Sequence, residues 1–274
     1  MDTQHALVRA SLSSGKALRL ARISDPATRR AHIVPMDHSV TVGPLGPVDH
    51  TERMVSVLAG TGINAVVLHR GRINRVPVDA FTSIGLIVHL SAGTSMSLDT
   101  DAKVLVSGVE AAVRSGADAV SIHVNIGSQS ERQQLADFAA VARECDVLGV
   151  PLLAMMYARG PQQNASSSAN TLAHLAAIAT DLGADMIKLD YAGSPSAMQS
   201  VVASTPVPVY VAGGATVSDD AAIALGAEVM SSGVAGLSFG RNVFNATNPV
   251  RVATALARIV HKRIADSDRV AALA

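Results

Sequence analysis

Eight short apolar runs, rich in β-branched residues, recur along the whole chain and constrain its fold more than any other feature. Each run is continuously apolar rather than alternating with polar residues, which is typical of parallel strands covered on both faces. Eight such runs, separated by Ala-rich segments with helical spacing, predict a (β/α)8 barrel of the α/β class. We expect the strands at residues 32–36, 65–68, 86–90, 119–124, 151–156, 185–189, 207–211 and 235–239.

The segments between the runs predict helices that end at glycine. Gly62, Gly116, Gly183 and Gly233 each stand just before an apolar run, where a left-handed residue ends a helix. A doubly wound open sheet is the alternative fold, but no glycine-rich dinucleotide motif follows the first run. We expect helices at residues 101–115, 131–148 and 171–182, and a helical cap before residue 32 that closes the bottom of the barrel.

No linker or change of composition divides the chain, so residues 1–274 are expected to form one domain. Apolar residues make up 49% of the chain and charged residues 16%, which is enough for a large core and argues against disorder. The formal net charge of zero, without a basic stripe, argues against nucleic-acid binding. Because we find neither a signal-peptide pattern nor a run of transmembrane length, we expect a cytoplasmic protein without membrane contact.

The potential metal ligands are few and poorly spaced. Cys145 is the only cysteine, which excludes an intrachain disulfide and a cysteine-rich metal site, and its helical flanks predict a packing role. His38, His69 and His123 stand near predicted strand ends, but no His-x-His or His-Glu-x-x-His spacing joins them. We therefore expect no metal.

Lys188 lies within the apolar run at residues 185–190, which reads as a buried strand. The chain has only four lysines, and the other three, Lys16, Lys103 and Lys262, stand in polar or helical surroundings where an ammonium should reach water. Burial generally lowers the pKa of an ammonium towards neutrality, and the free amine can attack a carbonyl to form a Schiff base. The alternative is a lysine at a strand end that reaches into solvent.

Polar residues and glycines gather where the predicted strands end, which is the edge of a barrel that carries catalytic groups. Phosphate sites in such barrels commonly follow strands seven and eight. Gly213, Gly214 and Gly240 stand there, and their backbone N–H groups can approach an anion closely, while Arg241 can add a charged donor. These residues predict a phosphate site, the alternative being that the glycines only make turns.

Two further strand-end residues are candidates for proton transfer. Tyr157 ends the strand before the lysine strand, so its hydroxyl could lie close to the Lys188 amine and pass protons. Asp37 follows the first strand, where a carboxylate could hold the Lys188 ammonium or act as a second proton carrier. For Tyr157 the alternative is a structural tyrosine that covers the core.

These motifs, taken in order, resemble those of the archaeal-type class I aldolases. That family includes the DhnA-type fructose-bisphosphate aldolases and 2-amino-3,7-dideoxy-D-threo-hept-6-ulosonate synthase, and residues 89–94 look most like the second of these. The resemblance runs from about Gly15 to about His261. The motifs that carry it are residues 34–38, 122–125, 154–160, 188, 211–214 and 240–242.

The resemblance implies a phosphorylated ketone donor held as an enamine on Lys188, with Tyr157 as proton shuttle and Asp37 as a further acid or base. It implies no cofactor, and a homo-oligomer that is often a decamer. Two departures are Ala158, where the family commonly has proline, and Ala215-Thr216, where it commonly has Pro-Lys. The residues expected to bind the phosphorylated substrate are His38, His123, Asn125, Arg159, Gly213, Gly214, Gly240 and Arg241.

Bacterial relatives in this family join dihydroxyacetone phosphate to L-aspartate 4-semialdehyde, giving an amino-dihydroxy-oxo-phosphooxyheptanoate that leads to an aminohydroxybenzoate. The resemblance implies that activity here. The alternatives are 2-amino-3,7-dideoxy-D-threo-hept-6-ulosonate synthase, fructose-bisphosphate aldolase, a coenzyme A-dependent thiolase, and a barrel that binds a phosphorylated metabolite without turnover. Arg159 or Arg70 could hold either a second phosphate or an acceptor carboxylate.

Overall fold

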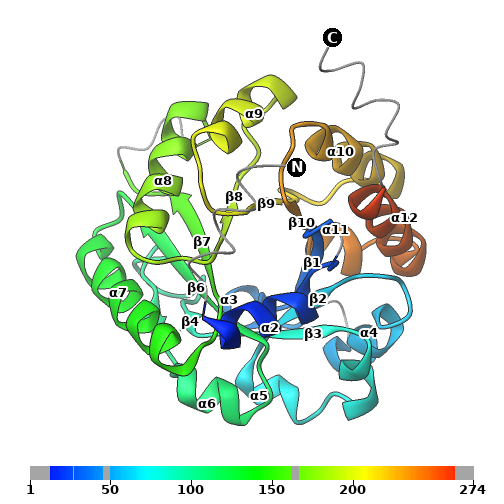
Figure 1. Cartoon of the computed structure of the whole chain (residues 1–274), viewed down its shortest axis with the longest axis horizontal. Helices are drawn as coiled ribbons and strands as arrows, with labels where there is room; N and C mark the ends of the chain where they lie inside the picture. The colour runs from blue at the N-terminus through cyan, green and yellow to red at the C-terminus, as the bar shows by residue number, and fades with distance from the viewer. Residues whose placement is uncertain (1–12, 27, 46–49, 162–166, 263–274) are drawn as a thin grey trace.

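The computed structural model describes residues 13–26, 28–45, 50–161 and 167–262. Eight parallel strands form a closed barrel with helices around it (Figure 1), as the sequence predicted. Around the barrel each strand pairs with the next along the chain, and β10 closes the ring on β1. The barrel strands are β1 (Ala31–Pro35), β2 (Ala65–His69), β3 (Gly85–His89), β6 (Ala119–Ile126), β7 (Leu152–Ala158), β8 (Met186–Leu189), β9 (Val209–Ala212) and β10 (Gly236–Ser238).

The helices follow the strands as expected, with one exception. Helix α7 covers the whole predicted segment 131–148, and α8 covers most of segment 171–182. The predicted glycines Gly62, Gly116, Gly183 and Gly233 all have positive φ. The helices are α2 (Ser14–Ile23), α3 (Ser39–Val42), α4 (Thr51–Leu58), α5 (Arg70–Ile73), η1 (Val78–Thr82), α6 (Val109–Arg114), α7 (Glu131–Leu148), α8 (Ala169–Asp181), α9 (Pro195–Ala203), α10 (Asp219–Ser231), α11 (Arg241–Phe244) and α12 (Pro249–His261).

The predicted helix at residues 101–115 is wrong over its first half. Only α6 is helical, while β5 (Val104–Leu105) pairs antiparallel with β4 (Ser91–Ala92). The backbone carbonyl of Asp101 accepts hydrogen bonds from Asn125 and Gln134, at 2.8 and 3.0 Å. These tertiary contacts hold the segment extended over the barrel rim, overriding its local helical preference.

Alternation along each strand divides the core into two layers. One set of side chains fills the barrel interior, and the opposite set packs between the strands and the helices. On β1, for example, Ile33 belongs to the interior cluster and Val34 to the outer one. Interior members from the other strands include Val67, Ile87, Leu153, Met155, Met186 and Tyr210. The interior is therefore packed, and chemistry is confined to its ends.

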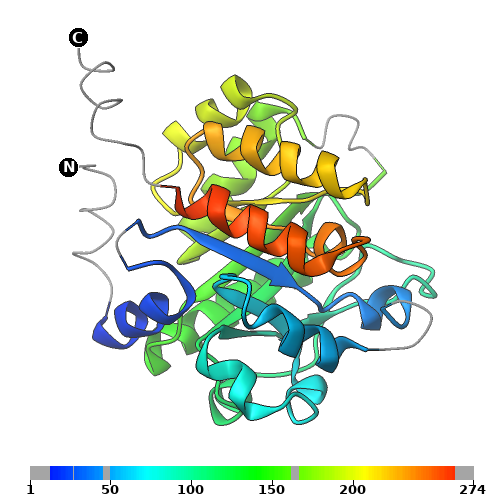
Figure 2. The same ribbon diagram turned by 90° about the vertical axis from the view of Figure 1, so that its right-hand side faces the viewer.

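Helix α2 covers the end of the barrel at which the strands begin, as predicted. Figure 2 shows β1 running from the end beside α2, in dark blue, towards the end where α3 lies. Lys16 forms ion pairs with Asp146 at 2.6 Å and Asp185 at 2.9 Å, and Arg22 pairs with Asp118. The expectation that Lys16 reaches water is wrong, since it is buried against these carboxylates.

Cys145 is fully buried, and burial raises the pKa of its thiol to about 12, in keeping with the predicted packing role. Within the described residues, no helix is long and apolar enough to cross a membrane.

Acid should destabilise the fold through His32, which is fully buried with both ring nitrogens unpartnered among the described residues. Burial, aided by the charge of His261, lowers its pKa to about 3. The unfolded chain binds this proton below about pH 6.5 and the folded chain does not, so stability falls as pH drops from 6.5 towards 3. By pH 5 the loss is about 2 kcal/mol.

Thermal unfolding between pH 5 and 7.5 checks this prediction. His32→Phe keeps a ring in the same space and should flatten the pH dependence of Tm. Replacing the exposed His174 with glutamine is the control and should leave that dependence unchanged. Equal pH dependence in the His32→Phe and unmodified proteins would contradict the assignment.

Candidate active site

A cavity of about 280 Å³ opens at the end of the barrel where the strands finish. Ten of the eleven predicted site residues line it, although the strands that carry them are spread along the chain. These are Asp37, His38, His123, Tyr157, Arg159, Lys188, Gly213, Gly214, Gly240 and Arg241. Asn125, the eleventh, does not line the cavity.

Lys188 projects from β8 into the barrel and is 6% exposed. Its strand neighbours in register are Met155 on β7 and Tyr210 on β9. Tyr157 stands two residues beyond Met155, so it lies on the same inward face, one step nearer the mouth of the cavity. The two predicted catalytic side chains therefore share one wall.

Asp37 faces several potential cations. Its Oδ1 lies 3.6 Å from His38 Nδ1, and its Oδ2 lies 3.7 Å from His89 Nε2. Burial alone would raise the pKa of the carboxyl group, but His89, His38 and Lys188 outweigh it and hold that pKa well below its usual range. Asp37 Oδ1 has no hydrogen-bond partner among the described residues, so this oxygen of the ionised carboxylate can accept a hydrogen bond from a ligand.

His69 and His89 support Asp37 from one side, and neither was predicted as a substrate-binding residue. Their rings meet edge to face, with centroids 5.2 Å apart, and His89 Nδ1 lies 2.8 Å from Ser121 Oγ. Burial lowers the pKa of both histidines, that of His89 to about 4, so His89 is neutral at pH 7. Strand alternation was the missed signal, because residues 69 and 89 continue the inward faces of β2 and β3.

Tyr157 is contacted by two basic side chains. The His123 ring lies 4.7 Å from the Tyr157 ring, and the Arg159 guanidinium lies 4.6 Å from its centre. Asn125 is fully buried, and its Oδ1 lies 2.8 Å from His123 Nε2. The Asn125 side chain thus orients His123 and donates to the backbone of Asp101, which explains why it does not reach the cavity.

The glycines that the sequence predicted to bind phosphate, here called the cradle, lie on the loops after β9 and β10. Arg241 donates to the carbonyl of Gly214 at 2.8 Å, and Asn242 donates to that of Gly213 at 2.7 Å. A Cβ on Gly240 would lie 2.5 Å from the Pro35 carbonyl oxygen, so only glycine fits there without movement. The cradle and Arg241 form a cationic end of the cavity that is accessible to an anion.

Lys103 forms part of the opposite end, contrary to the expectation that it reaches water. It is 7% exposed and lines the cavity together with Arg159. Burial, together with the charge of Arg159, lowers the pKa of its ammonium. No sequence signal marked Lys103, because its position depends on the extended segment that replaces the predicted helix.

Asp190 is another charged residue of this cavity that the sequence did not lead us to predict. It follows Lys188 by two residues and so shares its inward face, a signal that alternation could have provided. Burial raises the pKa of its carboxyl group, while Arg159 and Lys188 oppose the shift. Within the described part of the chain, the Asp190 carboxylate forms no hydrogen bond or ion pair.

In the barrel, the Lys188 strand β8 stands between β7, which leads to Arg159, and β9, which leads to Gly213 and Gly214. The Lys188 amine therefore lies between the basic group of Arg159 and the cradle. A substrate with a carbonyl in the middle and an anionic group at each end matches this order of charges. Among the described residues, no group of three or more histidine, cysteine or acidic side chains is arranged to hold a metal ion.

Comparisons with known proteins show the family to which the chain belongs. A family model described as DeoC/LacD family aldolase matches residues 31–246. A 2-amino-4,5-dihydroxy-6-oxo-7-(phosphonooxy)heptanoate synthase of Streptomyces griseus is 46% identical over 90% of each chain. A 2-amino-3,7-dideoxy-D-threo-hept-6-ulosonate synthase of Archaeoglobus fulgidus is 42% identical, over 90% of this chain and 91% of the relative.

A solved structure described as a Schiff base forming fructose-1,6-bisphosphate aldolase superposes with a TM-score of 0.82 at 26% identity. The match covers 90% of this chain and all of that one.

Proposed function

Since the chain belongs to the DeoC/LacD family of aldolases and is a class I, Schiff-base aldolase, we propose that it joins dihydroxyacetone phosphate to L-aspartate 4-semialdehyde. The product would be the seven-carbon amino-oxo-phosphooxyheptanoate, a precursor of an aminohydroxybenzoate. The observation that carries the proposal is a nearly buried lysine, Lys188, between two cationic ends of one cavity.

The product named for the Streptomyces relative supports this choice of substrates. Its oxo group is at carbon 6, its phosphate at carbon 7 and its hydroxyls at carbons 4 and 5. Cleavage of the bond between carbons 4 and 5 leaves a three-carbon phosphorylated ketone and a four-carbon amino aldehyde. These fragments are dihydroxyacetone phosphate and aspartate 4-semialdehyde.

We assign the donor phosphate to the cradle of Gly213, Gly214 and Gly240, with Arg241 as the charged donor. A phosphate there would direct the donor ketone towards Lys188. Ser238 lies in the same wall, and its buried hydroxyl has no partner among the described residues, so it is available to a donor oxygen.

We assign the acceptor to the other end. Lys103 and Arg159 repel each other across the cavity wall, and a carboxylate between them would relieve that repulsion. The unpaired carboxylate of Asp190 suits the ammonium group of an amino acid. The three charges together complement the α-amino and α-carboxylate groups of aspartate semialdehyde.

The proposed cycle uses Lys188 as the nucleophile and Tyr157 as the proton carrier. The Lys188 amine adds to the donor ketone, and water leaves to give an iminium, which loses a proton from carbon 3 and becomes an enamine. The enamine carbon then attacks the acceptor aldehyde, and water releases the product and Lys188. Tyr157 carries protons to and from the reacting oxygens and carbon, and His123 and Arg159 orient its ring.

Borohydride trapping tests the proposal. The protein is treated with borohydride in the presence of dihydroxyacetone phosphate or, separately, of fructose 1,6-bisphosphate, and analysed by intact-protein and peptide mass spectrometry. An adduct on Lys188 with dihydroxyacetone phosphate, and a seven-carbon amino acid product after addition of aspartate semialdehyde, is the expected result. No adduct with either ketone would contradict it.

Fructose-bisphosphate aldolase is the second candidate, because Lys103 and Arg159 could also hold a second phosphate. Release of triose phosphates from fructose 1,6-bisphosphate would favour that activity over the proposed one. A seven-carbon product formed only from a donor without phosphate, and not from dihydroxyacetone phosphate, would instead favour the dideoxy-heptulosonate activity named for the archaeal relative.

Replacing Asp190 with asparagine should weaken recognition of the amino group alone. Because one charge-assisted hydrogen bond is lost, kcat/KM for aspartate semialdehyde should fall about tenfold. Succinate semialdehyde has the same chain without the amino group, so its kcat/KM should change little. Steady-state rates with both aldehydes measure the ratio, and an equal loss with both would contradict the role.

We also propose that the enzyme is a homo-oligomer. Several large apolar side chains on the segment after β3 are well exposed, which favours contact with another chain. They are Met96, Leu98, Val104 and Val106. Light scattering coupled to size exclusion should give a mass that is a multiple of 28.1 kDa, and a monomer would contradict the proposal.

A further inference from the structure

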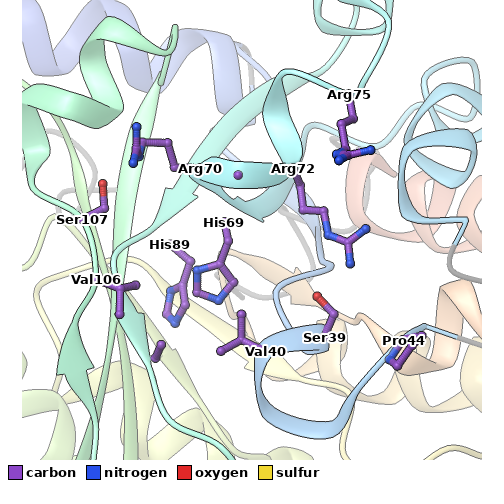
Figure 3. Close-up of a pocket in the computed structure, with 12 residues that line it drawn as sticks. Ser39, Val40, Pro44, His69, Arg70, Arg72, Arg75, His89, Val106 and Ser107 are labelled. Atoms are coloured by element: carbon purple, nitrogen blue, oxygen red, sulfur yellow. The ribbon is translucent and has the colours of Figure 1, made fainter.

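A second and larger cavity lies beside the substrate cavity on the same end of the barrel, with a volume of about 690 Å³ (Figure 3). Helix α3 separates the two, because Ser39 and Val40 line this cavity while Thr41 and Val42 line the other. The volume falls within the range of roughly 300–1,000 Å³ that small-molecule sites occupy.

The lining is strongly basic. Arg70, Arg72 and Arg75 all contribute to it, and among the described residues no aspartate or glutamate does. Arg72 is partly neutralised by Glu52, whose Oε1 lies 3.3 Å from its Nη1. Arg70 and Arg75 have no hydrogen bond or ion pair within the described ranges. Three positive charges within six residues repel one another, and an anion in the cavity would relieve that repulsion.

The charges are also spread out. Figure 3 shows Arg70 on the side of Ser107 and Arg72 pointing towards Ser39, with His69 and His89 between them. A single small anion would contact the guanidinium of either Arg70 or Arg72. A ligand with two or more charged groups could contact both guanidinium groups. The arrangement therefore fits a multiply charged small molecule, such as one that carries phosphate groups.

The cavity shares a wall with the catalytic centre. His69 and His89 line it, and the same His89 ring lies 3.7 Å from the Asp37 carboxylate in the substrate cavity. An anion held by the arginines would stand beside this histidine pair and favour its cationic form. Binding of an anion would thus change the electrostatic surroundings of Asp37 through the His69 and His89 side chains.

We propose that this arginine-lined cavity is a second site, which binds a multiply charged, phosphate-bearing small molecule while the substrate cavity is occupied. The site is distinct from the donor cradle, because its arginines come from the segment after β2 rather than from the loops after β9 and β10.

Calorimetric titration with inorganic pyrophosphate tests the proposal, using an Arg241→Gln background that weakens the cradle in the substrate cavity. In that background, Arg70→Gln and Arg75→Gln should each raise Kd about tenfold. Both side chains are exposed, so neither replacement removes buried packing. Arg132→Gln, an exposed arginine on α7, removes the same charge elsewhere and should leave Kd unchanged.

Occupancy of both cavities is tested by titrating pyrophosphate into protein whose Lys188 carries the borohydride-reduced donor. Retained binding is expected, and loss of binding on the adduct would overturn the proposal. Unchanged Kd in the Arg70→Gln and Arg75→Gln proteins, or no binding at all, would overturn it as well. If no adduct forms, the proposed aldolase reaction fails, but the Arg241→Gln titration still decides the second site.

Discussion

The Lys188→Arg protein is expected to fold and to lose activity by about 10⁴-fold or more, because the guanidinium cannot form a Schiff base. The replacement keeps the positive charge that faces Asp37 and Asp190, so the electrostatic balance of the cavity is preserved. Borohydride in the presence of dihydroxyacetone phosphate should leave the mass of this protein unchanged. Initial rates and intact mass together measure both effects.

Lys262→Arg is the matched control, since Lys262 is exposed and distant in sequence from the cavity residues. It should keep full activity and form the adduct. Full activity in Lys188→Arg would refute the Schiff-base role of this residue. Lys188→Met, which fills a similar volume without charge, distinguishes loss of the amine from poor packing, and should be equally inactive.

The Asp37→Asn protein should lose about 10²- to 10³-fold in kcat, with little change in shape. The pKa of Asp37 lies well below its usual range, which makes it a weak base and a stable negative charge. At pH 7 His89 is neutral, so the charge of Lys188 remains a main partner of Asp37. We infer that Asp37 acts mainly as the counter-charge of the iminium on Lys188.

The pH profile separates this role from that of a general base. A carboxylate that stays ionised throughout the working range gives the same ratio of unmodified to Asp37→Asn activity at every pH between 5 and 8. Rates of trapping by borohydride should fall in parallel with kcat, because the iminium itself is less stable. A ratio that decreases towards pH 5 would show that Asp37 takes up a proton in this range and would contradict the counter-charge role.

Local sequence patterns predicted most of the architecture because each depends only on near neighbours. The runs that became strands were apolar in isolation, and the segment 131–148 had both the composition and the length of α7. Glycines such as Gly183 end helices through their own backbone freedom. The segment 101–115 failed because β4 pairing and the hydrogen bonds on Asp101 come from elsewhere in the chain.

Some residues of the site were predictable from the local sequence, and others were not. Lys188, Tyr157, Asp37 and the cradle glycines stood out in the sequence, since a lysine in an apolar strand and paired glycines at strand ends are unusual locally. Lys103 did not, because nothing near it in the chain shows that it is buried against Arg159. The second cavity was equally hidden, since it forms only where α3 meets the segment after β2.

The sequence by itself determined the order of strands and helices, the closed parallel barrel and the lysine at its centre. Apolar periodicity, glycine placement and residue type are properties of short stretches of chain. Only the tertiary structure decided which ionisable groups face one another, namely Asp37 towards His89 and Lys103 beside Arg159. The physical reason is that electrostatic effects depend on distances through space, which strand register and loop packing determine.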